Sequence, residues 1–404
     1  MIFPPPWLIR VASMNALPSP LQQIDRKYVL YRGKRFSYFG GCDYFRLASH
    51  PRVLRAAREG LATFGLNVSA SRATTGNHRL YERLEIELAR FFDVQTALLV
   101  PNGYITNLAV AQTLSGRFSH ALLDARAHPS LADAAQFLDC PIVKFQHRDV
   151  EDLGRVLRRL GSGVRPILLT EGMFSHDGSV APLKAYLRIL PKDSLVLLDD
   201  AHGAGVLGRT GKGTAEYAGV SRRRIIQTVT LSKAFGVYGG AILATRELRE
   251  QIIIRSRLFT GSTPLPLPLA SAALEAVEIL RNGSRLRARL QRNVDRLKTA
   301  LWEEGLFEER TPGPVVSLVP RHDREAHVLK RSLVRRNILP AFIRYPGGPA
   351  GGYFRFAISS EHTRTQLDLL MRALTEARAS GDAPGNWRRG GDSNPRYGVN
   401  RTTV

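Results

Sequence analysis

Two kinds of hydrophobic pattern alternate along most of the chain. Stretches with apolar residues at helical spacing are followed by short, almost wholly apolar runs rich in Val, Ile and Leu. Short apolar runs between helices are typical of a parallel sheet that is buried on both faces. The expected helices are 51–64, 80–92, 105–114, 129–138 and 150–160, and the expected strands are 96–100, 120–124, 141–145, 166–171, 194–200, 225–231 and 239–245.

This pattern divides the chain into four parts. Residues 46–283 are expected to form a large α/β domain with a mainly parallel sheet. Residues 284–380 are expected to form a smaller α+β domain, because long helical stretches there enclose a few short strands. An N-terminal arm, 1–45, is interrupted by prolines and contains short strands at 28–31 and 35–39, whereas 381–404 has no apolar period and is expected to be a disordered tail.

Composition narrows the class of protein. The 404 residues are 44% hydrophobic and 23% charged, which is ordinary for a folded protein, and no apolar run reaches the roughly 18 residues of a membrane span. Two cysteines, Cys42 and Cys140, are too few for a disulfide framework or a cysteine zinc site. We therefore expect a cytoplasmic protein without a metal centre.

The net charge of +23 raises the question of nucleic-acid binding. The basic residues, however, are scattered on helical stretches such as 284–298 and are not interleaved with aromatic residues. A basic surface also suits anionic small substrates. We expect no nucleic-acid partner.

Lys233 is the first candidate for chemistry. It follows the apolar, β-branched run 225–231 and is flanked by small and hydroxyl residues, in the order Thr230-Leu-Ser-Lys-Ala-Phe-Gly. A lysine at a strand end is able to lose its charge by desolvation and to form a Schiff base with an aldehyde. Thr230 would donate its hydroxyl to a nearby phosphate. The alternative is a loop lysine that solvates a turn.

A second group of candidates stands at other strand ends. The run 194–198 ends in Asp199 and Asp200, and His202 follows closely. Ligands of open α/β sheets bind beyond the carboxyl ends of the strands, and an aspartate there favours a protonated heteroaromatic nitrogen. A helix cap or a metal-binding pair is the alternative for these carboxylates.

Two weaker candidates come from the neighbouring strand ends. Gly103 and Tyr104 lie between an expected strand and helix, where free backbone N–H groups suit a phosphate. His128 follows the strand 120–124, where a single histidine is either a capping residue or part of a site.

Together these segments resemble the α-oxoamine synthase family, in the class II aminotransferase superfamily of fold-type I enzymes that depend on pyridoxal phosphate (PLP). The resemblance covers about residues 38–378. Its most specific motifs are EGMFSHDGSVAPL (171–183), LLDDAHGAGVLG (197–208) and TLSKAFG (230–236); SRATTGNHRLYERLE (71–85), NGYITNLA (102–109), DARAHPSLADA (124–134) and FRFAISSEHT (354–363) extend it.

The resemblance implies a role for each matching residue. Lys233 binds PLP covalently and moves protons, and His128 stacks on the cofactor ring and assists catalysis. Asp199 pairs with the ring nitrogen, and Arg355 takes the carboxylate of the amino-acid substrate. The remaining cofactor-binding residues are Gly103, Tyr104, Ser175, His202, Thr230, Ser262 and Thr263, of which the last two reach the phosphate of the partner subunit in a homodimer with shared active sites.

Three departures from the family pattern concern the substrates. Cys42 stands where the family has an asparagine that helps to hold the substrate carboxylate. Residues 1–35 have no clear match to the helix and arginine that recognise the acyl chain, and the loop at 345–348 lacks the usual threonine. PLP binding is unaffected by these changes, whereas the amino acid and the acyl donor are left open.

The implied activity is the decarboxylative condensation of an amino acid with an acyl-CoA or acyl-carrier thioester. The central motifs look most like those of the 8-amino-7-oxononanoate synthases, which implies L-alanine and a pimeloyl thioester, as in biotin biosynthesis. Two other readings stay open: an α-oxoamine synthase such as glycine C-acetyltransferase or serine palmitoyltransferase, and a fold-type I aminotransferase. A basic regulatory protein that keeps the fold without catalysis is disfavoured by intact Lys233, Asp199 and His128.

Overall fold

A seven-stranded sheet organises the molecule, seen here in a computed structural model that describes residues 20–306, 311–344, 349 and 351–379. Its strand order is β4-β10-β9-β8-β7-β5-β6, and all pairs are parallel except the two made by β10. The strands are β4 (Thr96–Val100), β5 (His120–Asp124), β6 (Ile142–Phe145), β7 (Pro166–Glu171), β8 (Leu195–Asp199), β9 (Ile225–Thr230) and β10 (Gly240–Ala244).

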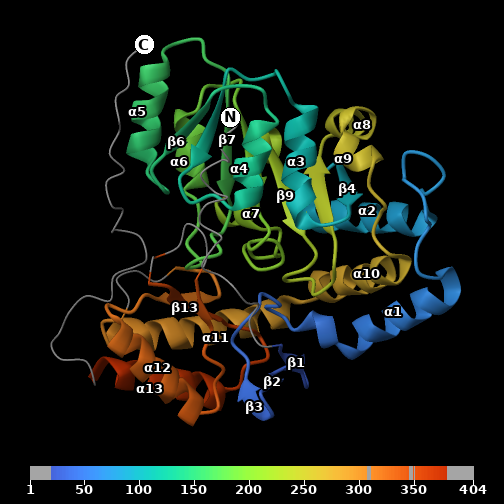
Figure 1. The fold of residues 1–404 in the computed structure, drawn as a ribbon. Coiled ribbons are helices and arrows are strands. Elements are labelled where there is room, and N and C mark those ends of the chain that lie inside the picture. Colours follow the sequence, from blue (N-terminus) through green and yellow to red (C-terminus); the bar gives the residue numbers. More distant parts are fainter. Residues whose placement is uncertain (1–19, 307–310, 345–348, 350, 380–404) are drawn as a thin grey trace, which may run out of the picture.

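Helices cover both faces of this sheet (Figure 1). Alternate residues of each strand point to opposite faces, so Leu98 and Val100 join one apolar cluster while Ala97 and Leu99 join another. The helices of this part are α1 (Pro51–Phe64), α2 (Arg79–Phe92), α3 (Gly103–Thr113), α4 (Pro129–Gln136), α5 (Val150–Leu160), α6 (Leu183–Ile189), α7 (Thr214–Tyr217), α8 (Arg246–Arg255), α9 (Arg257–Thr260) and α10 (Leu267–Arg281), with 3-10 turns at Leu47–Ser49 and Arg222–Arg224.

A smaller antiparallel sheet lies beyond α10, at the lower left of Figure 1. Its order is β11-β13-β12, formed by β11 (Val315–Leu318), β13 (Tyr353–Ala357) and β12 (Phe342–Ile343). The accompanying helices are α11 (Ser284–Glu303), α12 (Asp323–Arg335) and α13 (Arg364–Ala379). This unit supplies one wall of the site described below.

The N-terminal strands β1 (Gln22–Gln23), β2 (Tyr28–Tyr31) and β3 (Lys34–Ser37) form a third sheet, next to the small unit. A bridge joins Ser37 to Ile338, and the Ala357 N–H donates to the Phe39 carbonyl at 2.6 Å. The chain then enters the central part through Cys42–Leu47, so this segment lies between the two larger units.

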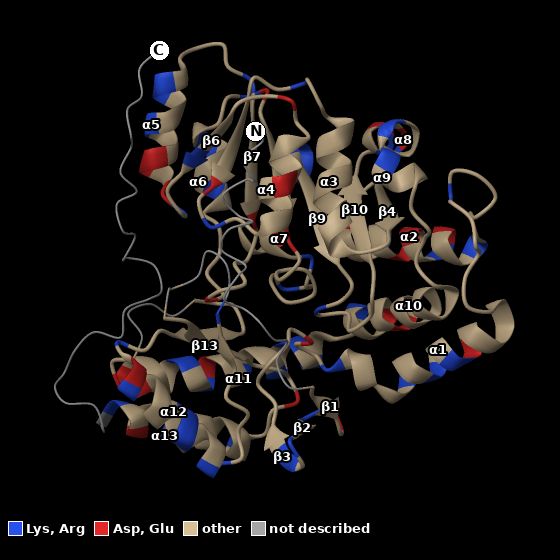
Figure 2. Ribbon diagram, viewed as in Figure 1, with Lys and Arg blue, Asp and Glu red and all other residues tan. Residues whose placement is uncertain are grey.

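Charged residues lie mainly on the outer helices. In Figure 2 the strands β4, β9 and β10 carry none, whereas α5, α8, α12 and α13 carry many. Within the described ranges, no helix is both long and apolar enough to cross a membrane.

The expected fold class is confirmed, with two differences in detail. β10 runs antiparallel to both of its neighbours, because only residues 231–239 connect it to β9 and a parallel crossover needs about a dozen residues or more. The helices α6 to α10 were not expected from the sequence. The longest of them, α10, begins after Pro266 and accommodates Pro268 in its first turn, where proline is tolerated. The tail that was expected to be disordered, the start of the arm and the 345–348 loop lie outside the described residues.

Candidate active site

The carboxyl ends of β7, β8 and β9 bring three of the site side chains together. Glu171, Asp199 and Thr230 are the last residues of these strands, and all three are buried. Lys233 follows β9 within one short turn, closed by a hydrogen bond from the Gly236 N–H to the Lys233 carbonyl at 2.9 Å. The sheet edge therefore combines two carboxylates with one amine.

Asp199 is fixed by donors to both of its oxygens. Its Oδ2 accepts from Asn107 Nδ2 at 2.7 Å and from Ser130 Oγ at 3.5 Å, and its Oδ1 accepts from the Ala201 N–H at 3.0 Å. Asn107 lies on α3, is fully buried and is itself held by the Thr228 hydroxyl at 2.6 Å. The carboxylate is thereby held in a single orientation at the strand end.

The neighbouring Asp200 has a different environment, because adjacent residues of an extended strand point to opposite sides. It accepts hydrogen bonds from the Thr214 N–H and hydroxyl and from Gln227 Nε2, at 2.8, 2.6 and 2.7 Å. Burial raises the pKa of Asp200 to about 7, although these bonds oppose the shift. Of the two carboxylates considered from the sequence, only Asp199 joins Asn107 and Ser130.

The first turn of α3 packs against the end of β9. A Cβ on Gly103 would lie 2.7 Å from Thr230 Cβ, so only glycine allows this approach. Asn102 caps the helix through a 3.1 Å bond from the Ile105 N–H, and the Thr230 hydroxyl donates to the Gly239 carbonyl. Tyr104 is partly exposed and donates its hydroxyl to Asp133. The helix start therefore presents backbone N–H groups beside Thr230.

His128 is both a helix cap and a member of this cluster. Its Nδ1 accepts the Ser130 N–H at 3.2 Å at the start of α4 and lies 2.8 Å from Ser130 Oγ. Burial lowers the pKa of His128, with Lys233 adding to the effect and Asp199 opposing it. The neutral ring therefore carries its hydrogen on Nε2, because Nδ1 serves as the acceptor.

Glu171 lies close to two other ionisable groups at the sheet edge, Asp199 and Lys233, and both influence its pKa. Burial and, after it, the nearby Asp199 carboxylate raise the pKa of Glu171 to about 8, although Lys233 opposes the shift. Its side chain accepts from the Ser175 N–H at 3.3 Å. A protonated Glu171 leaves Asp199 as the carboxylate that balances Lys233.

Arg355 reaches the site from β13 of the small unit. Its Nε donates to the Ser175 carbonyl at 2.7 Å, and its Nη2 donates to Cys42 Sγ at 3.5 Å. Ser317, paired with Arg355 across the small sheet, donates its hydroxyl to the His176 carbonyl. The small sheet is thus attached to the turn that follows β7.

His202 is buried at the centre of the cluster. Its Nδ1 lies 2.7 Å from the Tyr44 hydroxyl. Burial lowers the pKa of His202 well below its ordinary value, and the positive charges of Lys233 and Arg355 act in the same direction. The ring is therefore neutral and lies near both cations.

Two of the residues expected at the site are separate from the others. Ser262 donates its hydroxyl to the Leu258 carbonyl at 2.5 Å, and Thr263 is exposed. Within the described part of the chain, no hydrogen bond or ion pair joins either residue to the other site residues.

Four residues of the cluster were not singled out from the sequence: Tyr44, Asn107, Ser130 and Glu171. Nothing in the local sequence marks Asn107, inside a helix, or Tyr44, in the N-terminal arm, as a residue of the site. Glu171 did have one, since it ends an expected strand in the same way as Asp199.

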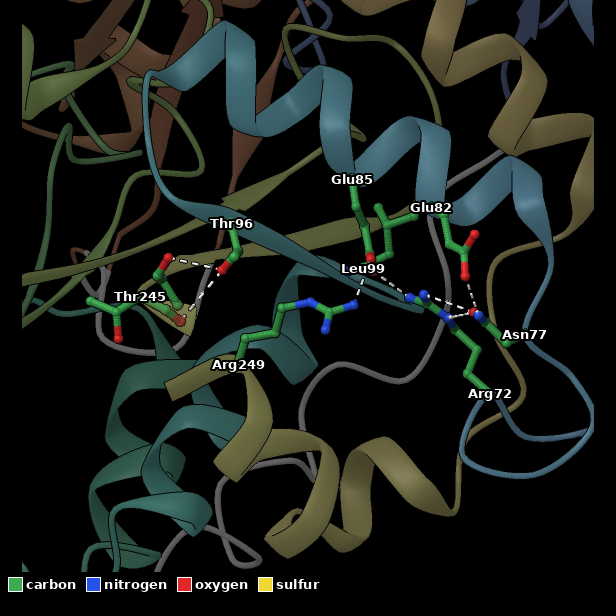
Figure 3. Close-up of polar contacts among 9 residues, drawn as sticks. Arg72, Asn77, Glu82, Glu85, Thr96, Leu99, Thr245 and Arg249 are labelled. Atoms are coloured by element: carbon green, nitrogen blue, oxygen red, sulfur yellow. Dashed lines mark hydrogen bonds and ion pairs between the residues drawn. The ribbon is translucent and has the colours of Figure 1, made fainter. Parts of the chain in front are cut away.

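The segment 71–85, which extends the family resemblance, forms a buried ion-pair network away from the cluster (Figure 3). Glu85 accepts from Arg72, from Arg249 of α8 at 3.1 Å and from the Leu99 N–H of β4 at 2.9 Å. Asn77 binds Arg72 through its carbonyl oxygen at 3.0 Å. The network ties α2 to the edge strand beside β10.

Replacing Glu85 with glutamine should lower the free energy of unfolding by about 3 kcal/mol, because it leaves the buried Arg72 guanidinium without a counter-charge. Denaturant unfolding measures the change. Glu82→Gln, on the exposed side of α2, is the control: its amide oxygen is still able to accept from Asn77, so the free energy of unfolding should stay within about 0.5 kcal/mol of the parent. Equal effects of the two substitutions would contradict a structural role for the ion pair.

No group of three or more His, Cys, Asp or Glu side chains suited to a metal ion occurs among the residues that the structure describes. The donor set fits PLP instead. Three groups that would suit PLP lie at one sheet edge. They are the fixed, buried carboxylate of Asp199, the amine of Lys233, and the start of α3, where Gly103 leaves no room for a side chain.

Comparisons with known proteins agree with this geometry. The family model for aminotransferase class I and II matches residues 40–374. The 8-amino-7-oxononanoate synthase of Thioalkalivibrio sulfidiphilus (strain HL-EbGR7) is 35% identical over 345 residues, which are 85% of this chain and 88% of that protein.

Two solved structures show the same fold. A serine palmitoyltransferase variant from S. paucimobilis, with PLP bound as an adduct with myriocin, is 28% identical and has a TM-score of 0.83 over 89% of this chain and 91% of its own. The 8-amino-7-oxononanoate synthase of Francisella tularensis is 26% identical, with a TM-score of 0.73 over 84% of this chain and 97% of its own.

The chain therefore belongs to the aminotransferase class I and II family of fold-type I enzymes. Within that family it belongs with the α-oxoamine synthases, among which its relatives include 8-amino-7-oxononanoate synthases.

Proposed function

We propose that this protein is a PLP-dependent acyltransferase that condenses L-alanine with a pimeloyl thioester. The products are 8-amino-7-oxononanoate, carbon dioxide and the free thiol of the acyl carrier. The observation that carries the proposal is the convergence of Asp199, Lys233 and Arg355 on one buried cluster, in a chain 35% identical to an 8-amino-7-oxononanoate synthase. This activity is a step of biotin biosynthesis.

The residues around the sheet edge would hold the cofactor. The N–H groups of Gly103 and Tyr104 would bind its phosphate, with the Thr230 hydroxyl beside them. Asp199, oriented by Asn107, would pair with the ring nitrogen and keep it protonated. When bound, PLP withdraws electrons from the α-carbon of the amino acid through its ring.

The proton-moving groups are Lys233 and His128. Lys233 would bind PLP covalently, and the amine would then take the α-proton of the amino acid once the substrate has displaced it. His128 would stack on the cofactor ring and direct its Nε2–H to the oxygen of the reacting thioester. Ser175 and His202 would lie near the ring hydroxyl.

Arg355 would orient the amino acid by binding its carboxylate. The guanidinium is buried and already donates to Ser175, so its plane is fixed before the substrate arrives. Cys42 lies against the same guanidinium and would line the carboxylate pocket. A fixed carboxylate positions the α-proton for Lys233.

We also propose a cytoplasmic homodimer in which the segment around Ser262 and Thr263 reaches the phosphate of the partner subunit. Thr263 is exposed, and Leu54, Leu61 and Phe64 of α1 expose apolar surface that a second copy would cover. Both cysteines are free, in keeping with a reducing compartment. Light scattering at working concentration measures the assembly, and a fully active monomer would rule the dimer out.

The test of the function is an assay of free thiol release, with pimeloyl-, acetyl- and palmitoyl-CoA crossed with L-alanine, glycine and L-serine. Alanine with pimeloyl-CoA is expected to give the highest kcat/KM. Highest activity with serine and palmitoyl-CoA would reassign the protein to the chemistry named for its serine palmitoyltransferase neighbours. Conversion of a 2-oxo acid without thiol release would identify an aminotransferase.

A further inference from the structure

Tyr81 joins the helix α2 to the segment 261–266, which leads from α9 to α10. Its hydroxyl donates to the Leu265 carbonyl at 2.6 Å, and both residues are almost wholly buried. Tyr81 has no part in the proposed chemistry. Its hydrogen bond nevertheless holds the segment that carries Ser262 and Thr263.

The Tyr81 ring is in turn held by the buried ion-pair network around Glu85. The Arg72 guanidinium, which pairs with Glu85, lies over the Tyr81 ring at 5.2 Å from its centroid. The same guanidinium lies over the ring of Phe259 in α9, at 5.9 Å. A cation over the face of a buried ring favours one ring position, so the Tyr81 hydroxyl meets Leu265 at a fixed place.

The segment is anchored on both sides of its exposed part. On the α9 side, Gln112 Oε1 accepts from the Ser256 hydroxyl at 3.0 Å and from the Leu258 N–H at 3.3 Å. On the α10 side, the anchor is the bond from Tyr81 to the Leu265 carbonyl. Thr263 lies between the two anchors and is exposed.

The order Thr263-Pro264-Leu265-Pro266 makes the segment stiff beside Tyr81. Proline restricts its own φ angle and biases the residue before it to extended backbone. Pro266 has a φ of −53° and a ψ of 136°, close to the polyproline conformation. Because Thr263 and Leu265 each precede a proline, a fixed Leu265 carbonyl limits where the Thr263 side chain lies.

We propose that Tyr81 is a positioning residue for the active site of the partner subunit. By holding the Leu265 carbonyl, it places Ser262 and Thr263 where they reach the phosphate of the cofactor in the other copy. The inference rests on the shared active sites of the proposed function and deepens them, because it names the residue that sets the segment in place.

An effect within the same subunit is the alternative. The Leu265 side chain lies beside Gly239, where an added Cβ would be 3.4 Å from Leu265 Cδ1. Gly239 belongs to the connection between β9 and β10 that also carries Lys233. The experiment must therefore distinguish a site in the partner subunit from the site of the subunit that contains Tyr81.

The test places Tyr81→Phe in a chosen copy of a heterodimer. Two differently tagged copies are co-expressed and purified over both tags, and one copy carries Lys233→Ala, so that only the other attaches PLP covalently. In the first heterodimer, Tyr81→Phe is on the Lys233→Ala copy; in the second, it is on the copy that keeps Lys233. Both contain the same substitutions, so a general loss of stability affects them equally.

The affinity for PLP is the readout. Loaded heterodimers are dialysed against a series of free PLP concentrations, and the absorption band of covalently attached PLP gives the occupied fraction. In the first heterodimer the dissociation constant should rise about tenfold, roughly the worth of one hydrogen bond to a charged group. In the second it should stay near that of the heterodimer that carries Lys233→Ala alone.

Two further heterodimers provide the controls, each with its substitution on the Lys233→Ala copy. Tyr186 is as deeply buried as Tyr81, but within the described part of the chain its hydroxyl has no hydrogen-bond partner. Tyr186→Phe should therefore leave the affinity for PLP unchanged. Ser262→Ala combined with Thr263→Val removes both hydroxyls that are proposed to reach the phosphate, and it should weaken binding at least as much as Tyr81→Phe does.

The outcomes separate the inference from the proposed function. Equal affinities in the two Tyr81→Phe heterodimers would overturn the inference. A weaker affinity only in the second would also overturn it and would assign the bond a role within its own subunit. If the combined Ser262→Ala and Thr263→Val substitutions have no effect, or if the wild type is a monomer, the shared site of the proposed function fails instead.

Discussion

Lys233→Ala should abolish covalent attachment of PLP and lower thiol release by at least about 10³-fold, because the variant lacks both the attachment point and the amine that moves the α-proton. Borohydride reduction followed by peptide mass spectrometry locates the attached group. In the wild type the phosphopyridoxyl mass should appear on the peptide that contains Lys233.

Lys212→Ala provides the control for this prediction. Lys212 is also partly buried and lies in a glycine-rich loop, but it pairs with Asp93 at 3.3 Å and does not reach the sheet edge. That variant should keep the attached cofactor and nearly full activity. A wild type that takes up no PLP, or that carries it on another lysine, would remove Lys233 from this role.

Asp199→Asn should slow exchange of the alanine α-proton by on the order of 10²-fold or more, because a neutral amide no longer favours protonation of the ring nitrogen. The exchange is measured by NMR as deuterium incorporation in the absence of acyl donor. PLP content should change little, since the phosphate-binding residues and Lys233 are retained.

Asp200→Asn is the comparison that the structure supplies. Asp200 is buried and accepts hydrogen bonds from Thr214 and Gln227. Asparagine replaces one of the two accepting oxygens with an NH2 group, so the substitution should lower the free energy of unfolding by about 1–3 kcal/mol. Exchange per bound cofactor should stay near the wild-type rate. The opposite outcome, with slow exchange in Asp200→Asn and normal exchange in Asp199→Asn, would transfer the role to Asp200.

The sequence predicted most of the central sheet because its strands are buried on both faces and contrast sharply with the helices. The strands Thr96–Val100, His120–Asp124 and Pro166–Glu171 have the expected ends. Strand direction has no such signal within the strand itself. The direction of β10 was nevertheless accessible from the short 231–239 connection, which excludes a crossover.

The sequence predicted only those site residues that stand at or just after the end of a strand. Asp199 and Lys233 stand at such ends, but which of Asp199 and Asp200 joins the cluster depends on the faces of the strand. Asn107 occupies a helix interior and becomes recognisable only once the fold brings its side chain to Asp199 at the end of β8. The contact of Tyr44 with His202 joins residues 158 positions apart, so no local pattern reveals it.

The attachment of the small sheet to the turn after β7 has a consequence for how this pocket is able to evolve. Arg355 and Ser317 bind the main-chain carbonyls of Ser175 and His176, not their side chains. A backbone carbonyl persists through substitution, so both of these hydrogen bonds survive a change of side chain at either position. A lineage, or a designer working by mutagenesis, could therefore change side chains in this turn without removing the two hydrogen bonds that join it to the small sheet.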